Sequence, residues 1–401
     1  MQSTPRANRL AIAFFGRRNV GKSSLVNALT GQEVSLISDV PGSTADPVSK
    51  SMEFLPIGPI TVIDTAGLDD EGDLGAQKVR RARNIMAQTD LAVLVCDASS
   101  PDKTLETEWL KIMSVQGTRV LVVENKIDKA PAGGQEANWL PLAVPRVRVS
   151  AHSGQGLDLF KDALVALAAQ SPPENSLVAG LFPPGSLFML VAPQDQQAPK
   201  GRLILPQVQV IRDILDHGGL VSMADFSKIE EQMKAVSRRP DLVIVDAQVF
   251  GRVVEFIPAD WPVTAFSIIM ARAKGDLDLL AEGARQIDKL KAGDKVLVVE
   301  ACTHHALKND IARERIPELL NAKVGGGLRF EVMAGNDFPD DPSSAALIIS
   351  CGGCMISRGH YMARMKKAME ARVPMTNFGL ALSYLSGQMD RAVAPFKVKG
   401  L

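Results

Sequence analysis

Short apolar runs separated by polar or amphipathic stretches predict an α/β protein. In the first part of the chain such runs occur within 9–15, 61–70, 91–99 and 120–128, and each has the length of a strand. The stretch after the first run, SSLVNALTG, has the pattern of a helix. Strands that alternate with helices are typical of a parallel sheet, so we expect an α/β domain in residues 1–170.

The second part of the chain carries further apolar runs and begins after a proline-rich stretch, 171–186, which predicts a linker. Residues 187–270 are expected to form a small α/β middle domain. In residues 271–401, two apolar strands run directly into cysteines. This pattern predicts a doubly wound sheet, in which ligands gather at the carboxyl ends of the strands. We expect strands at the start of 187–219 and within 242–250, 262–275, 295–305, 328–333 and 345–354, and helices at the end of 187–219 and within 275–294 and 306–322.

The composition is that of an ordinary globular protein, with 401 residues of which 46% are hydrophobic and 22% charged. The 45 basic residues balance the 45 acidic ones, so no global positive field attracts nucleic acid or anionic lipid. The N-terminus lacks the apolar core of a signal peptide, and no apolar run is long enough to cross a membrane. With only four cysteines, the chain is expected in the reducing cytoplasm, without membrane or nucleic-acid partners.

The segment GRRNVGKSS, directly after the first apolar run, matches the phosphate-binding loop G-x-x-x-x-G-K-[ST]. Its glycines allow backbone N–H groups to surround phosphates at the N-terminus of the following helix. We expect Lys22 to reach the β- and γ-phosphates and Ser23 to ligate Mg²⁺. The candidate phosphate-binding residues are Gly16, Asn19, Val20, Gly21, Lys22, Ser23 and Ser24.

Three further motifs in the expected order predict a GTP-binding domain. In Asp-Thr-Ala-Gly, Asp64 can hold Mg²⁺ through water and the Gly67 N–H can sense a γ-phosphate. In Asn-Lys-Ile-Asp, the Asp128 carboxylate can accept two hydrogen bonds from guanine, whereas adenine would leave it unpaired. The candidate residues of these motifs are Asp64, Gly67, Asn125, Lys126, Asp128, Ser150 and Ala151.

These motifs resemble those of the Era/TrmE-like bacterial GTPases. The segment PGST resembles their switch I, which implies that Thr44 is a second Mg²⁺ ligand and places it with Lys22 and Gly67 in the catalytic set. Leu68 stands where Ras-like enzymes carry a water-orienting Gln, so we expect slow hydrolysis of GTP to GDP and phosphate. Asn19 lies where potassium-stimulated relatives place a K⁺ ligand, and the resemblance implies stimulation by K⁺.

Three cysteines lie in the C-terminal part. Cys351 and Cys354 flank two glycines after an apolar run, and Cys302 ends another run. Since strand carboxyl ends meet at one edge of a doubly wound sheet, we expect Cys302 to face the other two. The spacing leaves three alternatives open: a redox dithiol, a zinc site completed by His304 or His305, and an iron–sulfur cluster.

The motifs EACTHH and CGGCM, behind an Era-like GTPase, resemble the HydF family, the maturation GTPases of FeFe hydrogenases. The segments GRRNVGKSSLVNAL, DTAGLDD, QAPKGRLILPQVQ, TAFSIIMARAKGDLD and PMTNFG extend the resemblance over most of the chain. It implies a 4Fe–4S cluster on Cys302, Cys351 and Cys354, with His304 as a candidate fourth ligand. Ser350 departs from the family pattern, since many members have His at this position.

The resemblance also implies a function and a set of partners. The expected protein is a scaffold and carrier that delivers the diiron precursor of the H-cluster to apo FeFe-hydrogenase, with two radical-SAM maturases as further partners. It is expected to form a homodimer through its middle domain. The corresponding domains are a GTPase domain, a linker, a dimerisation domain and an iron–sulfur domain at 1–170, 171–186, 187–270 and 271–401.

An RNA-associated GTPase of the ribosome-assembly or tRNA-modification type, with a zinc site, is the alternative. The balanced charge and the lack of an RNA-binding module, such as a KH domain with its basic Gly-x-x-Gly loop, argue against it.

Overall fold

The computed structural model describes residues 9–31, 48–69, 82–86, 88–130, 139–170, 176–193, 203–301, 310–335 and 337–397. The chain divides into two compact units, Met1–Pro173 and Glu174–Leu401. Among the helices within these ranges, none is both long enough and apolar enough to cross a lipid bilayer.

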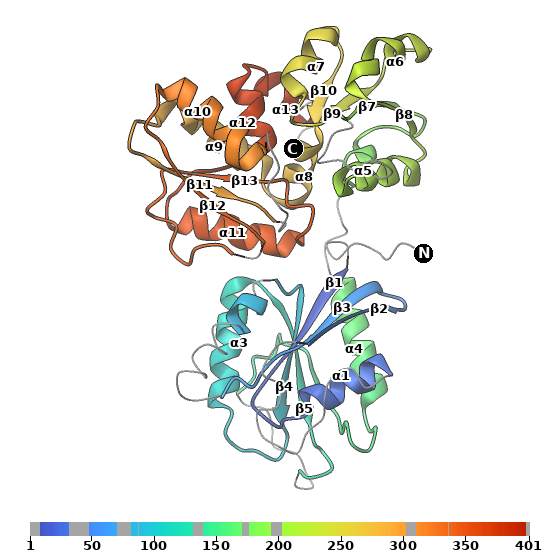
Figure 1. The fold of residues 1–401 in the computed structure, drawn as a ribbon. Coiled ribbons are helices and arrows are strands. Elements are labelled where there is room, and N and C mark those ends of the chain that lie inside the picture. Colours follow the sequence, from blue (N-terminus) through green and yellow to red (C-terminus); the bar gives the residue numbers. More distant parts are fainter. Residues whose placement is uncertain are drawn as a thin grey trace. The chain divides into compact units, whose positions relative to one another are not determined.

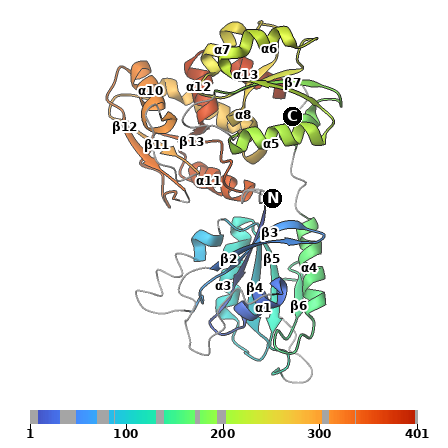
Figure 2. The same ribbon diagram turned by 45° about the vertical axis from the view of Figure 1, so that its right-hand side comes forward.

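The first unit is a six-stranded sheet with the order β2-β3-β1-β4-β5-β6, in which only β2 runs antiparallel to its neighbour (Figures 1 and 2). Its elements are β1 (Leu10–Phe15), α1 (Lys22–Thr30), β2 (Val48–Phe54), β3 (Gly58–Asp64), β4 (Leu91–Asp97), α3 (Thr104–Gln116), β5 (Arg119–Asn125), β6 (Arg146–Arg148) and α4 (Leu157–Ala169).

Alternating side chains of β1 build the two cores of this unit. Phe14 points to the face that α1 and α4 cover and meets Phe160 edge to face, with ring centroids 6.2 Å apart. Phe15 points to the opposite face and stacks on Trp109 of α3. Both phenylalanines are fully buried, and each burial contributes roughly 1.5–3 kcal/mol. Helices on both faces therefore fix the central strand that leads into the phosphate-binding loop.

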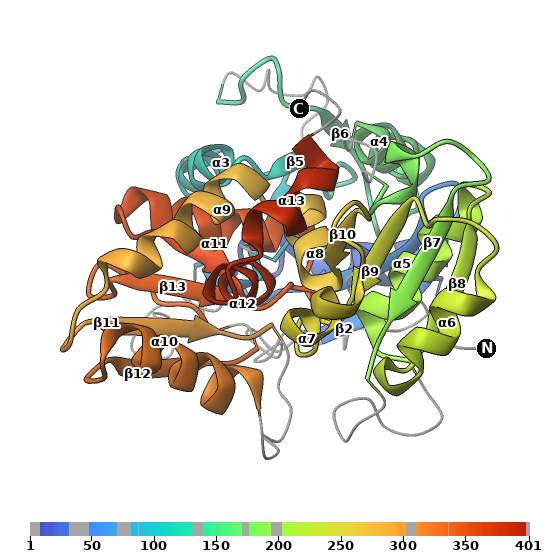
Figure 3. The ribbon, with the colours of Figure 1, turned by 90° about the horizontal axis from the view of Figure 1, so that it is seen from above.

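The second unit contains two four-stranded parallel sheets, β10-β9-β7-β8 and β12-β11-β13-β14 (Figure 3). Both have the same connectivity: the second strand lies outside the first, and the third and fourth follow on the other side. The elements of the first sheet are β7 (Leu187–Val191), α5 (Leu205–Asp216), β8 (Leu220–Ala224), α6 (Ile229–Ala235), β9 (Leu242–Val245), α7 (Phe250–Phe256), β10 (Val263–Ala265) and α8 (Phe266–Lys274).

The second sheet of this unit is joined to the first by α9. The elements from there on are α9 (Leu277–Arg285), β11 (Lys295–Val299), a π-helical turn (Ile311–Arg315), α10 (Ile316–Val324), β12 (Arg329–Met333), β13 (Leu347–Ser350), α11 (Arg358–Glu370), β14 (Met375–Asn377), α12 (Phe378–Leu385) and α13 (Met389–Lys397). Helices α8 and α12 meet where a Cβ on Gly379 would lie only 2.0 Å from the Ser267 Oγ, so a side chain is excluded there.

The α/β fold class, with an N-terminal phosphate-loop domain and further α/β sheets behind it, is confirmed. The strand expected within 262–275 is wrong for most of its length, because only Val263–Ala265 is extended and α8 follows. Residues Ile268 to Ala271 are all fully buried. A helix buried all round has no amphipathic period, so its sequence cannot be told from a buried strand.

Candidate functional site

The phosphate-binding loop lies between β1 and α1 and requires glycine at both ends. Gly21 has φ 93°, and a Cβ there would lie 2.2 Å from the Asn125 Nδ2. A Cβ on Gly16 would meet the Val95 carbonyl at 2.2 Å. Lys22 is 7% exposed, and its ammonium donates to the carbonyls of Gly16 (3.0 Å) and Arg17 (2.7 Å). Two backbone carbonyls of the loop therefore hold the Lys22 ammonium at the loop that is expected to bind phosphates.

The structure brings together two side chains that were predicted to hold Mg²⁺, Ser23 and Asp64. The Ser23 hydroxyl donates to one carboxylate oxygen of Asp64 at 2.6 Å. Asp64 is fully buried, and within the described residues its other oxygen has no hydrogen-bond partner. A buried carboxylate oxygen without a donor fits a site for a hydrated cation. Thr44, the predicted second ligand, lies outside the described residues.

The end of the Asp-Thr-Ala-Gly motif and Leu68 after it, the start of switch II, lie against the phosphate-binding loop. Gly67 approaches it so closely that a Cβ would meet the Arg18 Cγ at 2.3 Å. The Leu68 N–H donates to the Gly16 carbonyl at 3.2 Å, and its side chain is buried. An apolar, buried side chain cannot orient an attacking water, which agrees with the expectation of slow hydrolysis.

The base-recognition motifs converge through Asn125. Its amide donates to the Val20 carbonyl at 2.8 Å and accepts from the Ala151 N–H at 2.9 Å. It thus ties the phosphate-binding loop to the Ser-Ala motif. Asp128 is exposed, and a hydrogen bond from the Ser150 side chain is the main cause that lowers the pKa of its carboxyl. The carboxylate therefore stays ionised at neutral pH, as guanine recognition requires.

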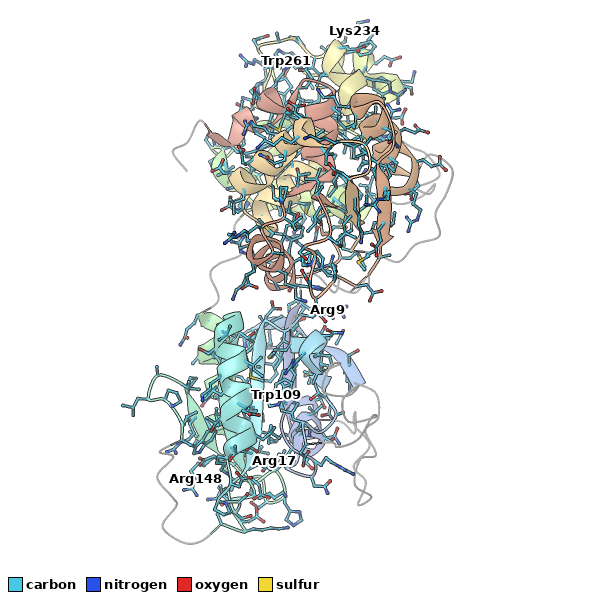
Figure 4. All side chains as sticks on the ribbon, turned by 90° about the vertical axis from the view of Figure 1, so that its left-hand side faces the viewer. Arg9, Arg17, Trp109, Arg148, Lys234 and Trp261 are labelled. Atoms are coloured by element: carbon cyan, nitrogen blue, oxygen red, sulfur yellow. The ribbon has the colours of Figure 1, made fainter. Side chains whose placement is uncertain are left out.

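The sequence analysis missed an ion-pair cluster that joins the phosphate-binding loop to α3. Arg17 pairs with the buried Glu106 at 3.0 Å and with Asp102 at 2.8 Å (Figure 4). Desolvation lowers the pKa of Arg17, but the two carboxylates outweigh it and raise the pKa overall. No local pattern reveals the pair, because 89 residues separate Arg17 from Glu106.

The predicted cysteine site begins where β11 and β13 end side by side. Val299 and Ser350 are register partners, and the Cys351 N–H donates to the Val299 carbonyl at 2.8 Å. Strands are added on one side of β11 first and on the other side afterwards, so the strand order reverses between β11 and β13. This position is the topological switch point, where α/β sheets characteristically bind ligands. Cys302 and His304 lie outside the described residues, so their expected approach to Cys351 stays a prediction.

The sulfur of Cys351 accepts two backbone N–H groups, from Ala301 at 3.1 Å and from Gly353 at 3.4 Å. Burial raises the pKa of this thiol, whereas the two N–H groups and the charge of Arg364 oppose the rise. N–H donors to sulfur favour a thiolate, so the donor set fits a metal-ligating cysteine. Within the described ranges no three His, Cys, Asp or Glu side chains are grouped to hold a metal.

Two helices hold the loop Cys351–Cys354. Lys274, at the end of α8, donates to the carbonyls of Gly353 (2.9 Å) and Ile356. On the α11 side, Gly353 has φ 66°, and a Cβ there would lie 2.7 Å from the Tyr361 ring. The glycines between the cysteines thus allow the close packing that shapes the loop.

Three family models match successive parts of this chain. Residues 11–126 match the 50S ribosome-binding GTPase model, 177–275 the Hydrogen maturase F dimerization domain, and 278–395 the Hydrogen maturase F tetramerization domain. The chain belongs to the HydF family of hydrogenase maturation GTPases. The HydF resemblance seen in the sequence is confirmed. The description of 278–395 as a tetramerization domain indicates an assembly role that the sequence analysis did not predict.

Other relatives share only the GTPase part of this HydF-family chain. The tRNA modification GTPase MnmE of Halorhodospira halophila is 36% identical over 179 residues, which cover 42% of this chain and 37% of that protein. GTPase Der of Sulfurimonas denitrificans is 39% identical over 127 residues, 31% of this chain and 26% of that protein. The chain thus spans well under half the length of these relatives.

Solved structures of GTPases are also similar to part of the chain. The cytosolic domain of the T. maritima FeoB iron transporter in its GDP form is 26% identical, with a TM-score of 0.33, and the match covers 41% of this chain and 65% of that one.

Proposed function

We propose that this protein binds and hydrolyses GTP, holds a 4Fe–4S cluster and delivers the diiron precursor of the H-cluster to apo FeFe-hydrogenase. The observation that carries the proposal is the match of 177–275 and 278–395 to HydF domains, combined with the cysteine loop at the switch point of the second sheet. Family membership supports the role in maturation, and the N–H groups directed at Cys351 support a thiolate ligand.

The GTPase unit supplies nucleotide binding and hydrolysis in this proposal. Ser23 and Asp64 would hold Mg²⁺, together with Thr44, and Lys22 would bind the β- and γ-phosphates. Asp128 would select guanine. The buried Leu68 cannot orient water at the position where Ras-like enzymes carry Gln, so hydrolysis would be slow and would be stimulated by K⁺ bound at Asn19.

The C-terminal sheet would hold the cluster. Cys302, Cys351 and Cys354 would be its ligands, with His304 as the candidate fourth. When bound, the cluster supplies one-electron redox chemistry and an iron corner not held by cysteine. The loop residues Gly352 and Gly353 keep this part of the backbone close to α8 and α11.

The remaining parts of the proposal concern assembly and partners. We propose a cytoplasmic homodimer formed through 187–270, with the GTPase domain at 1–170, the linker at 171–186 and the cluster domain at 271–401. The two radical-SAM maturases and apo-hydrogenase would be the exchange partners. The alternative of an RNA-associated GTPase has no support outside the GTPase domain, because the second unit matches HydF domains.

Anaerobic reconstitution of the full chain with iron and sulfide tests the proposal. We expect about four iron and four sulfide per chain and the EPR signal of a reduced 4Fe–4S cluster. The loaded protein, incubated with the two maturases, should then activate apo-hydrogenase. Stoichiometric zinc without iron in anaerobically purified protein would contradict the cluster, and a loaded protein that activates no hydrogenase would contradict the carrier role.

A further inference from the structure

Arg364, on α11, is a buried cation, and the residue is 2% exposed. Its Nη2 donates to the Gly335 carbonyl at 2.6 Å and its Nε to the His360 Nε2 at 3.3 Å, while its Nη1 has no hydrogen-bond partner among the described residues. Across the part of the chain that the structure describes, no carboxylate forms an ion pair with it. Burying a guanidinium without a counter-charge is costly, so an anion is expected at this place.

The position of Arg364 connects it to the cysteine loop. Tyr361 lies one turn earlier on the same helix face, and its ring packs on Gly353. Gly335, which accepts the bond from Arg364, follows β12. In the sheet order β12-β11-β13, the guanidinium therefore reaches from α11, the helix that follows β13, to the end of β12. Between them lies the end of β11, the strand that leads to Cys302.

Two acidic residues of the described part of the chain are already paired or exposed to solvent. Glu300, directly after β11, is 4% exposed and pairs with Arg313 at 2.6 Å. Asp337 attracts the guanidinium but is exposed. Desolvation lowers the pKa of Arg364, and a negative charge on Cys351 is the first influence that opposes it. The cysteine loop is therefore the candidate source of the missing negative charge, because its Gly353 packs on Tyr361, one turn from Arg364 on the same helix.

We propose that Arg364 is the buried counter-charge of an anionic iron–sulfur centre at the cysteine loop Cys351–Cys354, and that it raises the reduction potential of this centre. The inference rests on the proposed function. Each thiolate adds a negative charge, and one-electron reduction adds another. A fixed positive charge in a water-poor environment stabilises the more negative reduced state, and net charge near a cluster is one determinant of its potential.

The test is a redox titration of the reconstituted full chain, followed by EPR. Arg364→Met removes the charge and keeps an apolar chain of similar length, Arg364→Lys keeps the charge, and Lys366→Met removes a charge from the exposed side of the same helix. We expect Arg364→Met to lower the equilibrium constant for reduction at least tenfold, about 59 mV for one electron. Arg364→Lys should lower the reduction potential by less than half as much as Arg364→Met does. Lys366→Met should leave the reduction potential at the wild-type value.

The outcomes separate this inference from the proposed function. A fully loaded Arg364→Met protein with the wild-type potential would overturn the counter-charge, while the cluster assignment would stand. If wild-type protein takes up no cluster, both fail. If Arg364→Met folds, judged by circular dichroism, but does not retain iron, recovery of iron in Arg364→Lys supports the charge. Loss of iron in both variants would overturn the counter-charge, because the shape of the guanidinium and not its charge would then be needed to retain iron.

Discussion

The ammonium group of Lys274 lies 2.9 Å from the carbonyl oxygen of Gly353. Lys274 ends α8, inside the match to the dimerization domain, whereas Gly353 lies between the two cysteines in the match to the tetramerization domain. The same ammonium also donates to the Ile356 carbonyl, on the other side of Cys354. A residue of one matched domain thus holds the cysteine loop of the next.

Lys274→Met should loosen this loop. The change leaves two carbonyls without their donor, which we expect to lower the free energy of unfolding of the second unit by about 2 kcal/mol. Reconstituted protein should also lose iron to a chelator several-fold faster than wild type. Denaturant unfolding and chelator kinetics measure the two effects, and Lys291→Met, at an exposed position, is the matched control. Equal iron loss in Lys274→Met and wild type would show that the contact does not hold the site.

Asp128→Asn should change the nucleotide that is recognised. The ionised carboxylate accepts hydrogen bonds from guanine, and the amide would match xanthine instead. We expect the affinity for GDP to fall at least 100-fold, a loss of about 2.7 kcal/mol, and XDP to bind better than GDP. Calorimetric titration with both nucleotides measures the change. Undiminished GDP binding in the variant would disprove the assigned role of Asp128.

The Ser150 contact predicts a pH dependence in the same site. The pKa of Asp128 is lowered, with the Ser150 side chain as the main cause, so wild-type affinity for GDP is retained as the pH falls toward the ordinary carboxyl range. Ser150→Ala removes that hydrogen bond and should raise the pKa, so that affinity declines at a higher pH. Titrations from neutral pH down to about 3.5 follow the two proteins through the ordinary carboxyl pKa. Superimposable pH profiles would contradict the contribution of Ser150.

Asn19 should make GTP hydrolysis depend on potassium. Its backbone has φ 57°, a left-handed conformation that glycine also adopts. Asn19→Gly therefore removes the side chain without straining the loop. We expect wild-type phosphate release to be several-fold faster in K⁺ than in Na⁺ at equal ionic strength, and the variant to be equally slow in both. If wild-type rates do not differ between the two salts, Asn19 has no such role.

The GTPase site could be predicted from local sequence motifs, whereas features that depend on packing between distant segments could not. The residues from Gly16 to Ser23 are contiguous, so their geometry follows from one loop and the helix after it. The end of β13 could also be predicted, because an apolar run stops at Cys351. Arg364 gives no such signal, since an arginine in a mostly polar helix is normally exposed. Its burial follows from tertiary packing, in which its guanidinium donates to the carbonyl of Gly335 after β12.

The final prediction concerns the cysteines themselves. Cys302→Ser, Cys351→Ser and Cys354→Ser should each abolish a stable 4Fe–4S cluster, because three thiolates are the fewest that plausibly hold a cubane. Cys96 is the internal control: it is fully buried in β4, and burial raises the pKa of its thiol to about 12. Cys96→Ala should therefore keep full iron and sulfide. GTP hydrolysis should continue in all four variants, since the GTPase motifs and the cysteine loop lie in separate units. Full iron loading in Cys351→Ser or Cys354→Ser would refute the ligand set, whereas retained GTP hydrolysis with no hydrogenase activation would assign the two chemistries to the two units.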